Sequence, residues 1–305
     1  MNAPARTPQD RPGRLRVGVV GAGRVGSVLG AALHRAGHGV VATTAVSAHS
    51  LARAARLLPG AEVLSADAVA RRADLLLLAV PDDTLSDLVA GLVRTAAVRQ
   101  GQIIFHTSGA HGVAVLAPAA RVGALCLALH PVMTFTGRPE DLDRISGISY
   151  GVTAPPELRP VAESLVVEMG GEPEWVSEAD RPLYHAALAH GANHLSTLVN
   201  EAMDLLRQAG VAHPERMIAP LLSAAVDNTL RLSDRALTGP VARGDAGTVA
   251  CHLEILASRA PESVAAYLAL ARRTADRAIG SGRLRTGDAE ALLGVLTNPQ
   301  QGATT

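Results

Sequence analysis

Two polar residues stand where apolar runs of the sequence end, and both are suited to chemistry. Ser108 belongs to the segment HTSG, residues 106–109, and His130 closes the apolar run LCLALH. A hydroxyl can orient a substrate oxygen, and an imidazole can exchange a proton near neutral pH. We therefore take Ser108 as a candidate site residue and predict that His130 acts as acid or base. The alternative is a histidine that only caps a strand or fills the core.

A helical stretch further along the chain, residues 179–209, adds more polar candidates. At about 100° per residue, His185, Asn193 and Asn200 fall within one arc of a leucine-rich helix. Such a face suits a helix held against a cofactor or substrate, and we take His185 and Asn193 as candidates for catalysis. A hydrogen-bonded interface between domains would show the same pattern.

The segment LTGPVARGD, residues 237–245, carries two charged candidates. The guanidinium of Arg243 has the fork geometry that binds a substrate carboxylate. Asp245 stands where a helix would begin, which is the ordinary position of an N-cap. Arg243 is therefore a candidate substrate residue, and Asp245 is equally well explained as a cap.

The segment GAGRVG, residues 21–26, has the glycine spacing of a dinucleotide site. In such a site the first glycine allows a tight turn, the second admits a pyrophosphate, and the third lets helix and strand pack closely. We predict that Gly21, Ala22, Gly23, Arg24, Val25 and Gly26 bind a cofactor. The alternative is a strand-to-helix turn that binds nothing.

The choice of cofactor depends on the end of the next strand, where an NAD site usually carries a carboxylate. Residues 42–50 read ATTAVSAHS, and no carboxylate occurs before Glu62. Ser47 and Ser50, with His49 and Arg53, can surround a 2′-phosphate without repelling it, so we predict NADP. Arg53 could equally lie on a solvated helix face. Pro81 and Asp82 are expected beside the nicotinamide ribose, and Val80 is a further cofactor-binding candidate.

Metal and thiol chemistry are not expected. The segment HGANH, residues 190–194, spaces two histidines like ligands but lacks the glutamate of HExxH and a third ligand, so no metal site is predicted. Cys126 and Cys251 are far apart in apolar contexts, which favours inert thiols. The chain contains no lysine, and this excludes a Schiff base.

These candidates need a scaffold, and the apolar pattern predicts an α/β doubly wound sheet followed by an all-helical domain. The predicted strands are residues 15–20, 39–46, 73–80, 101–109, 122–131, 147–153 and 172–176. Continuous apolar strands of this kind indicate a parallel sheet covered on both faces. The helices between them are residues 24–36, 49–58, 83–95 and 156–169.

The expected domains are a Rossmann-type cofactor domain, residues 14–176, and a helical domain, residues 177–298. The helical domain should contain helices at residues 179–209, 214–230, 244–258, 263–279 and 288–296. Disordered tails are expected at residues 1–13 and 299–305.

Composition excludes several classes of function. The 28 basic and 28 acidic residues balance, and only six residues are aromatic, so we expect no nucleic-acid partner. No apolar run reaches the ~18 residues of a membrane span, and no leader segment is evident. We expect a cytoplasmic protein that binds a small molecule, with leucine- and alanine-rich helices that suggest a homodimer.

Taken together, the chain resembles Rossmann-like proteins that carry a C-terminal DUF2520 domain. The resemblance rests on GAGRVG, HTSG, His130-Pro131, YHAALAHGANHL and LTGPVARGD, which span most of the chain. The wider group has 6-phosphogluconate-dehydrogenase-like helical domains. It includes ketopantoate reductases, pyrroline-5-carboxylate reductases and prephenate dehydrogenases. The resemblance implies NADP-linked redox chemistry in which Ser108 and His130 contact the substrate. Relatives often have a lysine before the YH pair, where this chain has Arg181; an arginine cannot release a proton at neutral pH.

The sequence therefore predicts an NADP-dependent oxidoreductase that moves hydride to or from a small carboxylated 2-oxo or hydroxy acid, in a cleft between the domains. His130 is the expected acid or base, and Ser108 and Asn193 would orient the oxygen. Two alternatives stay open, an imine reductase of the pyrroline-5-carboxylate type and a catalytically silent NADP sensor.

Overall fold

The computed structural model describes residues 13–297, which form two compact units. The first unit ends at His190 and the second begins at Gly191. The change of sequence pattern lies earlier, near Ser177. The boundary between the units does not coincide with that change and falls inside a helical segment. The predicted tails lie outside the described residues, except for Gly13.

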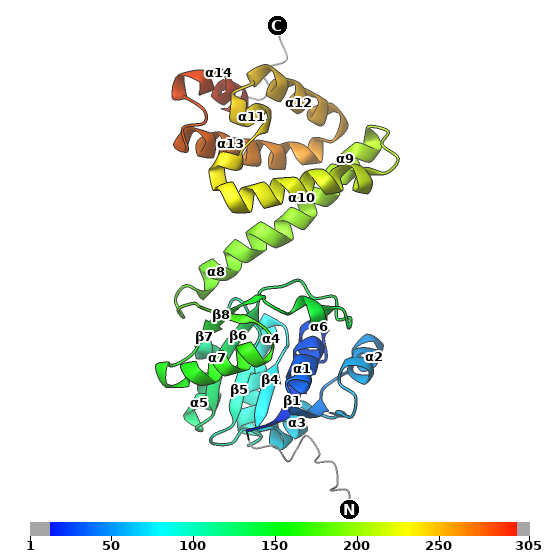
Figure 1. Cartoon of the computed structure of the whole chain (residues 1–305), viewed down its shortest axis with the longest axis vertical. Helices are drawn as coiled ribbons and strands as arrows, with labels where there is room; N and C mark the ends of the chain where they lie inside the picture. The colour runs from blue at the N-terminus through cyan, green and yellow to red at the C-terminus, as the bar shows by residue number, and fades with distance from the viewer. Residues whose placement is uncertain (1–12, 298–305) are drawn as a thin grey trace, which may run out of the picture. The chain divides into compact units, whose positions relative to one another are not determined.

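The first unit is built on an eight-stranded sheet in the order β3-β2-β1-β4-β5-β6-β7-β8 (Figure 1). The strands are β1 (Arg16–Val20), β2 (Gly39–Thr43), β3 (Glu62–Val63), β4 (Leu75–Leu78), β5 (Ile103–His106), β6 (Leu125–Pro131), β7 (Ser149–Thr153) and β8 (Glu172–Trp175). Strands β1 to β6 are parallel, and the order reverses between β1 and β4. In open α/β sheets, ligands bind at such a switch point, beyond the carboxyl ends of the strands.

Alternate side chains of the central strands enter two separate cores, one on each face. Leu75 and Leu77 pack with α1 (Arg24–Arg35) and α7 (Arg159–Glu168). Leu76 and Leu78 pack on the other face with three helices, α3 (Ala66–Arg72), α4 (Asp82–Arg94) and α5 (Ala117–Arg121). Because both faces are covered, the strands read as unbroken apolar runs rather than alternating ones. The predicted doubly wound fold is confirmed.

Three details of the sheet differ from the prediction. Strand β7 runs antiparallel to β6, so the sheet is parallel only in part. The prediction missed β3, because a two-residue strand of exposed residues carries no apolar signal. It also missed the short helices α3 and α5, as well as α6 (Asp141–Arg144). The remaining helix of the sheet region, α2 (Ala48–Leu57), is present where expected.

The second unit is helical, as predicted. It contains α9 (His194–Gln208), α10 (Pro214–Leu232), α11 (Gly239–Arg243), α12 (Ala246–Arg259), α13 (Val264–Gly280) and α14 (Thr286–Thr297). Helix α8 (Arg181–Leu188) precedes it and leads through a π-helical turn, Ala189–Asn193, into α9. The core of this unit comes from α11 to α14.

Helices α9 and α10 contribute almost nothing to that core. Helix α9 has no buried residue, and α10 buries only Pro214. Large apolar side chains of α10 are exposed, including Met217, Leu221 and Leu230. Side chains of these types are more often buried. Among residues 13–297, no helix is both long and apolar enough to cross a membrane.

Candidate functional site

The turn between β1 and α1 requires glycine at the first and third motif positions. Gly21 has φ +104°, and a Cβ there would collide with the carbonyl oxygen of Ala79. A Cβ at Gly26 would collide with the carbonyl of Gly21, so the helix packs directly on the turn. At Gly23 a Cβ would meet no atom within 4 Å, and this leaves the backbone open to a ligand. The three glycines thus have the three roles that a dinucleotide site requires.

Thr44, directly after β2, holds this turn in place. Its hydroxyl accepts a hydrogen bond of 2.8 Å from the amide of Gly21, and its carbonyl accepts one of 2.9 Å from Ala22. The amides of Arg24 and Val25 lie in the first turn of α1, where N–H groups have no acceptor within the helix. That turn contains no acidic residue. A phosphate group is the ligand that such an end of a helix favours.

The residues predicted to bind a 2′-phosphate follow the end of β2. The two serines among them already hydrogen-bond to each other at the start of α2. Ser47 caps α2 by accepting from the amide of Ser50, and the two hydroxyls lie 3.1 Å apart. Arg24 and Arg53 both pack against Gly137, and Nε of Arg53 donates to the carbonyl of Ala22. The guanidinium of Arg53 therefore lies at the glycine turn, and the stem of Arg24 packs next to it against Gly137.

The end of β4 also lies beside the glycine turn. The nearest side-chain carbon of Val80 would be 3.5 Å from a Cβ at Gly21. Pro81 is the N-cap of α4 and Asp82 is its first residue. Val80, Pro81 and Asp82 thus lie at the edge of the sheet, next to the glycine turn.

The loop after β5 is fixed by a buried histidine. Nε2 of His106 donates to the carbonyl of Gly112 at 2.8 Å, and Nδ1 accepts from the amide of Ser108 at 3.2 Å. Both ring nitrogens are used, so His106 shapes the loop. The hydroxyl of Ser108, which is almost fully buried, accepts from the amide of His111 at 3.1 Å.

His130, at the end of β6, meets the helix α8. Its Nδ1 lies 2.8 Å from the hydroxyl of Tyr184, and the two rings are perpendicular with centroids 5.6 Å apart. The ring of His185 lies 6.2 Å from that of His130. A Cβ at Gly109 would lie 3.0 Å from Nε2 of His130 and 2.7 Å from Cδ2 of His185. Gly109 therefore lets both rings pack directly against the backbone.

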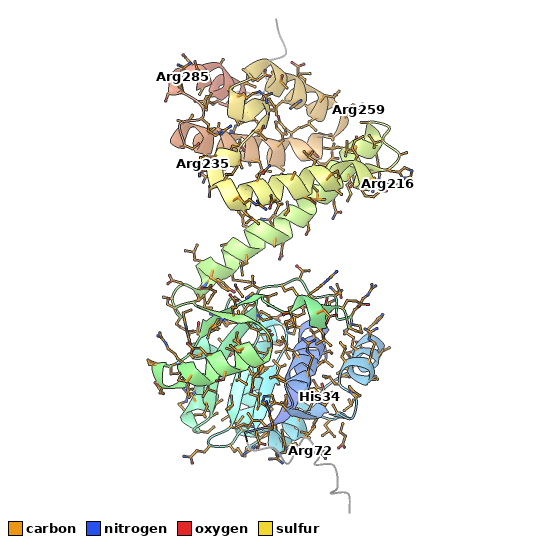
Figure 2. The ribbon with its side chains drawn as sticks, viewed as in Figure 1. His34, Arg72, Arg216, Arg235, Arg259 and Arg285 are labelled. Carbon is orange, nitrogen blue, oxygen red and sulfur yellow. The ribbon has the colours of Figure 1, made fainter. Side chains whose placement is uncertain are left out.

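Arg181 is buried behind this group, unlike surface arginines such as Arg216 and Arg259 (Figure 2). Its guanidinium donates only to neutral oxygens: the hydroxyl of Thr153 and the carbonyls of Ser108, Ala128 and Gly151. Within residues 13–297, no carboxylate forms an ion pair with it. Burial lowers the pKa of Arg181, but a guanidinium stays charged in proteins.

The buried charge adds to the effect of burial on the two histidines. Burial, which is the larger cause, and the charge of Arg181 together lower the pKa of His106 and of His130 to about 4. His185 also lowers the pKa of His130, while Asp82 opposes the shift. At neutral pH, His130 is therefore a neutral imidazole, which can donate or accept a hydrogen bond but carries no ready second proton.

Glu178 ties the loop after β5 to the segment that leads into α8. Its carboxylate accepts from the amides of Val113 at 2.7 Å and Ala114 at 3.2 Å. A Cβ at Gly112 would collide with that carboxylate. The loop that carries Ser108 and the helix that carries Tyr184 are thus held by the same side chain.

Two predicted site residues, Asn193 and Arg243, belong to the second unit. Asn193 ends the π-helical turn, and Arg243 is an exposed residue at the end of α11. Asp245 caps α12 by accepting from the amide of Thr248 at 3.1 Å, so the capping interpretation is confirmed. The predicted polar face was calculated for an unbroken α-helix, and the π turn changes the spacing after Ala189. Among the described residues, no group of three potential ligands could hold a metal.

The sequence analysis missed Tyr184 as a site residue and treated Arg181 only as a departure from the relatives. Arg181, Tyr184 and His185 are spaced i, i+3 and i+4, which places them on one face of a helix. Calculating the helix face from Arg181 rather than from His185 would have found them.

Comparison with protein families supports the two-part architecture. Residues 1–131 match the Rossmann-like domain, and residues 148–274 match a domain of unknown function, DUF2520. The resemblance to proteins that combine these two domains is confirmed. No curated protein matches the sequence.

Three solved structures illustrate the likeness in fold. A Bacteroides fragilis protein classed as an NADP oxidoreductase has a TM-score of 0.72 and 21% identity, over 86% of this chain and 98% of its own. A reductive aminase from Aspergillus terreus, in complex with NADPH and ethyl levulinate, has a TM-score of 0.59 and 19% identity, over 92% of this chain and 99% of its own. Pyrroline carboxylate reductase from Plasmodium falciparum, with NADP bound, has a TM-score of 0.54 and 13% identity, over 87% of this chain and 98% of its own.

Proposed function

We propose that this protein, a Rossmann-like domain followed by a DUF2520 domain, is an NADP-dependent oxidoreductase acting on a small carbonyl or hydroxy compound. The observation that carries the proposal is the convergence of the glycine turn, Ser108 and His130 at the carboxyl ends of neighbouring parallel strands. A cofactor site and a proton-exchanging site are thereby adjacent. When bound, a reduced nicotinamide would supply hydride there.

The glycine turn fits the cofactor. Gly23 leaves the backbone uncovered, and the first-turn amides of α1 suit a pyrophosphate. Val80, Pro81 and Asp82 would border the nicotinamide ribose. Arg24 and Arg53 would hold a 2′-phosphate, with the capped end of α2 at Ser47 and Ser50 beside it.

The cofactor proposal has a direct binding test. NADPH should bind at least tenfold more tightly than NADH, roughly 1.4 kcal/mol, in titrations followed by cofactor fluorescence. Arg53→Ala should remove most of that preference, while Arg72→Ala, on α3 and paired with Glu62, should keep it. Equal affinities of the wild type for the two cofactors would contradict the assignment.

His130 is the proposed group for proton exchange with the substrate oxygen, and Ser108 and His185 border the same space. Asn193 and Arg243 remain proposals for orienting the oxygen and a carboxylate. The test is a screen of 2-oxo acids and cyclic imines in which NADPH absorbance is followed. Turnover of a 2-oxo acid supports the proposal.

An imine reductase is the second candidate, and the similar structures named as a pyrroline carboxylate reductase and a reductive aminase favour keeping it. Turnover restricted to cyclic imines would select it. Tight NADPH binding without turnover of any compound would instead indicate a sensor.

We also propose that two copies of the chain associate through α9 and α10. Burial of an apolar side chain stabilises by roughly 1.5–3 kcal/mol, yet Leu221 and Leu230 are 68% and 81% exposed. A second copy would cover these residues. Light scattering should give twice the monomer mass, and Leu221→Glu with Leu230→Glu should give the monomer mass. The matched control is Ile255→Glu, since Ile255 is exposed on α12.

A further inference from the structure

The second unit contains a cavity of about 360 Å³ whose lining residues all belong to that unit. One wall is a single face of α9, on which Leu198, Ala202 and Leu205 are spaced i, i+4 and i+7. Leu256 of α12 and Leu270 of α13 belong to the other walls. Sites for small molecules are concave and mostly apolar, with a few polar groups and volumes of roughly 300–1,000 Å³. This cavity has the size and the composition of such a site.

A single carboxylate, that of Glu201 on α9, belongs to this lining. Its Oε1 accepts a hydrogen bond of 2.5 Å from the hydroxyl of Ser263, which is buried. Within residues 13–297, no basic side chain forms an ion pair with Glu201. A carboxylate has about four acceptor positions, and one hydroxyl fills only one of them. Glu201 can therefore accept further hydrogen bonds from a bound cation.

A second cavity, of about 390 Å³, adjoins the first, because Glu201 and Ser263 line both. Its lining adds the carboxylates of Asp204 and Glu262 and no basic side chain. Asp204 is paired with Arg207 at 2.6 Å, whereas Glu262 has no ion pair in the described part of the chain. Negative charge without a paired cation therefore gathers at one side of an apolar cavity, and it attracts positive ligands.

The other polar groups nearby supply no permanent positive charge to the first cavity. Nδ1 of His252 lies 2.9 Å from the hydroxyl of Tyr267, so these two lining residues are bonded to each other. Arg259 donates to the carbonyl of Gln208, and its own side chain lines neither cavity. A ligand with a negative group would thus meet no fixed cation among the described lining residues. A ligand with a positive group would meet the carboxylate of Glu201.

We propose that this cavity of the second unit binds a small aliphatic amine as its ammonium ion. The ammonium group donates to Glu201, and the apolar body lies among the leucines of α9, α12 and α13. A hydrogen bond between two charged groups is roughly twice as strong as a neutral one, and each buried methylene group tightens binding by about fourfold. The site goes beyond the oxidoreductase function proposed above and does not depend on it, because no residue of the first unit takes part.

The first experiment tests the class of ligand on full-length, ¹⁵N-histidine-labelled protein at pH 7, where alkylamines are protonated. The probes are hexylamine, butylamine, 1-hexanol and hexanoate. Hexylamine should shift the signals of His252, assigned by their loss in His252→Gln, and leave those of His130 in place. Its Kd should be at least tenfold lower than the Kd of 1-hexanol or hexanoate, and about tenfold lower than that of butylamine, which is shorter by two methylene groups. Equal affinities for hexylamine and 1-hexanol, or no saturable shift of His252, overturn the proposal.

The second experiment tests the role of Glu201. Glu201→Gln removes the charge and keeps an oxygen that can accept from Ser263, so hexylamine should bind tenfold or more weakly while 1-hexanol stays within about twofold. The matched control is Glu254→Gln, because Glu254 is an exposed carboxylate on α12 that lines neither cavity. It should change neither affinity. Wild-type affinity for hexylamine in Glu201→Gln overturns the proposal.

The third experiment tests the cavity itself and decides the matter even if Glu201→Gln does not fold. Ala266 is an exposed lining residue of α13, so Ala266→Phe places a ring at the cavity and should abolish the shift of His252 by hexylamine. Ala269→Phe, exposed on the same helix but outside the lining, should keep that shift. Hexylamine binding in Ala266→Phe as in the wild type overturns the proposal. The alternative occupant is a second copy of the chain: a smaller mass of Ala266→Phe in light scattering, with no hexylamine shift in the wild type, would select it and overturn the amine site.

Discussion

The two units of the molecule each contain a histidine hydrogen-bonded to a tyrosine, with nearly the same geometry. In the first unit the Nδ1 to hydroxyl distance is 2.8 Å for His130 and Tyr184, and in the second it is 2.9 Å for His252 and Tyr267. The ring centroids lie 5.6 and 5.9 Å apart, and both pairs are perpendicular within a degree.

Their surroundings differ. The pair of His130 lies at the end of a buried strand against the charge of Arg181, beside the loop of Ser108. The pair of His252 lines a cavity of about 360 Å³ whose walls are mostly apolar side chains of α9, α12 and α13. The same hydrogen bond is therefore part of a polarised site in one unit and of a helical packing surface in the other. Contact geometry alone does not tell which of the two pairs takes part in chemistry.

The largest expected difference between the pairs is the response of stability to acid. The pKa of His106 and His130 is about 4 in the folded chain against about 6.5 when unfolded. Between these values the unfolded chain binds protons that the folded chain does not. The contribution to stability is complete above pH ~6.5 and is lost as pH falls toward 4, by about 3 kcal/mol per histidine at most.

This pH dependence can be measured by urea unfolding at pH 7 and 4.5, followed by the fluorescence of Trp175, the single tryptophan, which lies in the first unit. His130→Gln should reduce the pH dependence of the free energy of unfolding. The same pH dependence in His130→Gln as in the wild type would mean that the histidine is not held neutral.

A smaller difference is expected in turnover. His130→Gln keeps a polar side chain but cannot exchange a proton, so the rate should fall by ~10²-fold, about 2.7 kcal/mol. NADPH affinity should stay within about twofold, because the ring is aimed at the substrate. His252→Gln should leave both quantities within about twofold in the same steady-state and titration measurements. Wild-type turnover in His130→Gln would make His130 a structural residue.

The smallest difference concerns the contact between Gly109 and the two rings. In Gly109→Ala the new methyl group would press on Nε2 of His130 and on the ring of His185, so kcat/KM should fall about tenfold. The control is Gly247→Ala on α12, where a Cβ meets no atom within 4 Å. That variant should keep full activity and gain up to ~1 kcal/mol of stability. Equal activities of the two variants would place the reacting atoms elsewhere.

The parts of the site that depend on local sequence were predictable. The glycine spacing, the apolar strands and the polar residues that end them all follow from rules that span a few residues. The placement of Ser108 and His130 at one edge of the sheet was predictable in this way, because the carboxyl ends of parallel strands lie at one edge. The antiparallel β7 was not predictable, since strand direction depends on pairing partners distant in sequence.

The role of Arg181 was not predictable either, because it depends on burial. The sequence shows an arginine where relatives often carry lysine, and this excludes a proton donor but does not reveal what replaces it. Only the fold places its guanidinium among the carbonyls of β6, β7 and the loop after β5. The π turn, Ala189–Asn193, similarly breaks the regular spacing on which the prediction for Asn193 depended.

The carboxylate of Glu178 has a consequence for how this region moves. By accepting from the amides of Val113 and Ala114, it joins the loop after β5 to the start of α8, and Arg181 adds a second link through Ser108. Neither segment can open without breaking bonds to the other, so they form one cooperative unit. In hydrogen exchange, the amides of Val113 and Ala114 should therefore exchange at the rate at which the first turn of α8 opens.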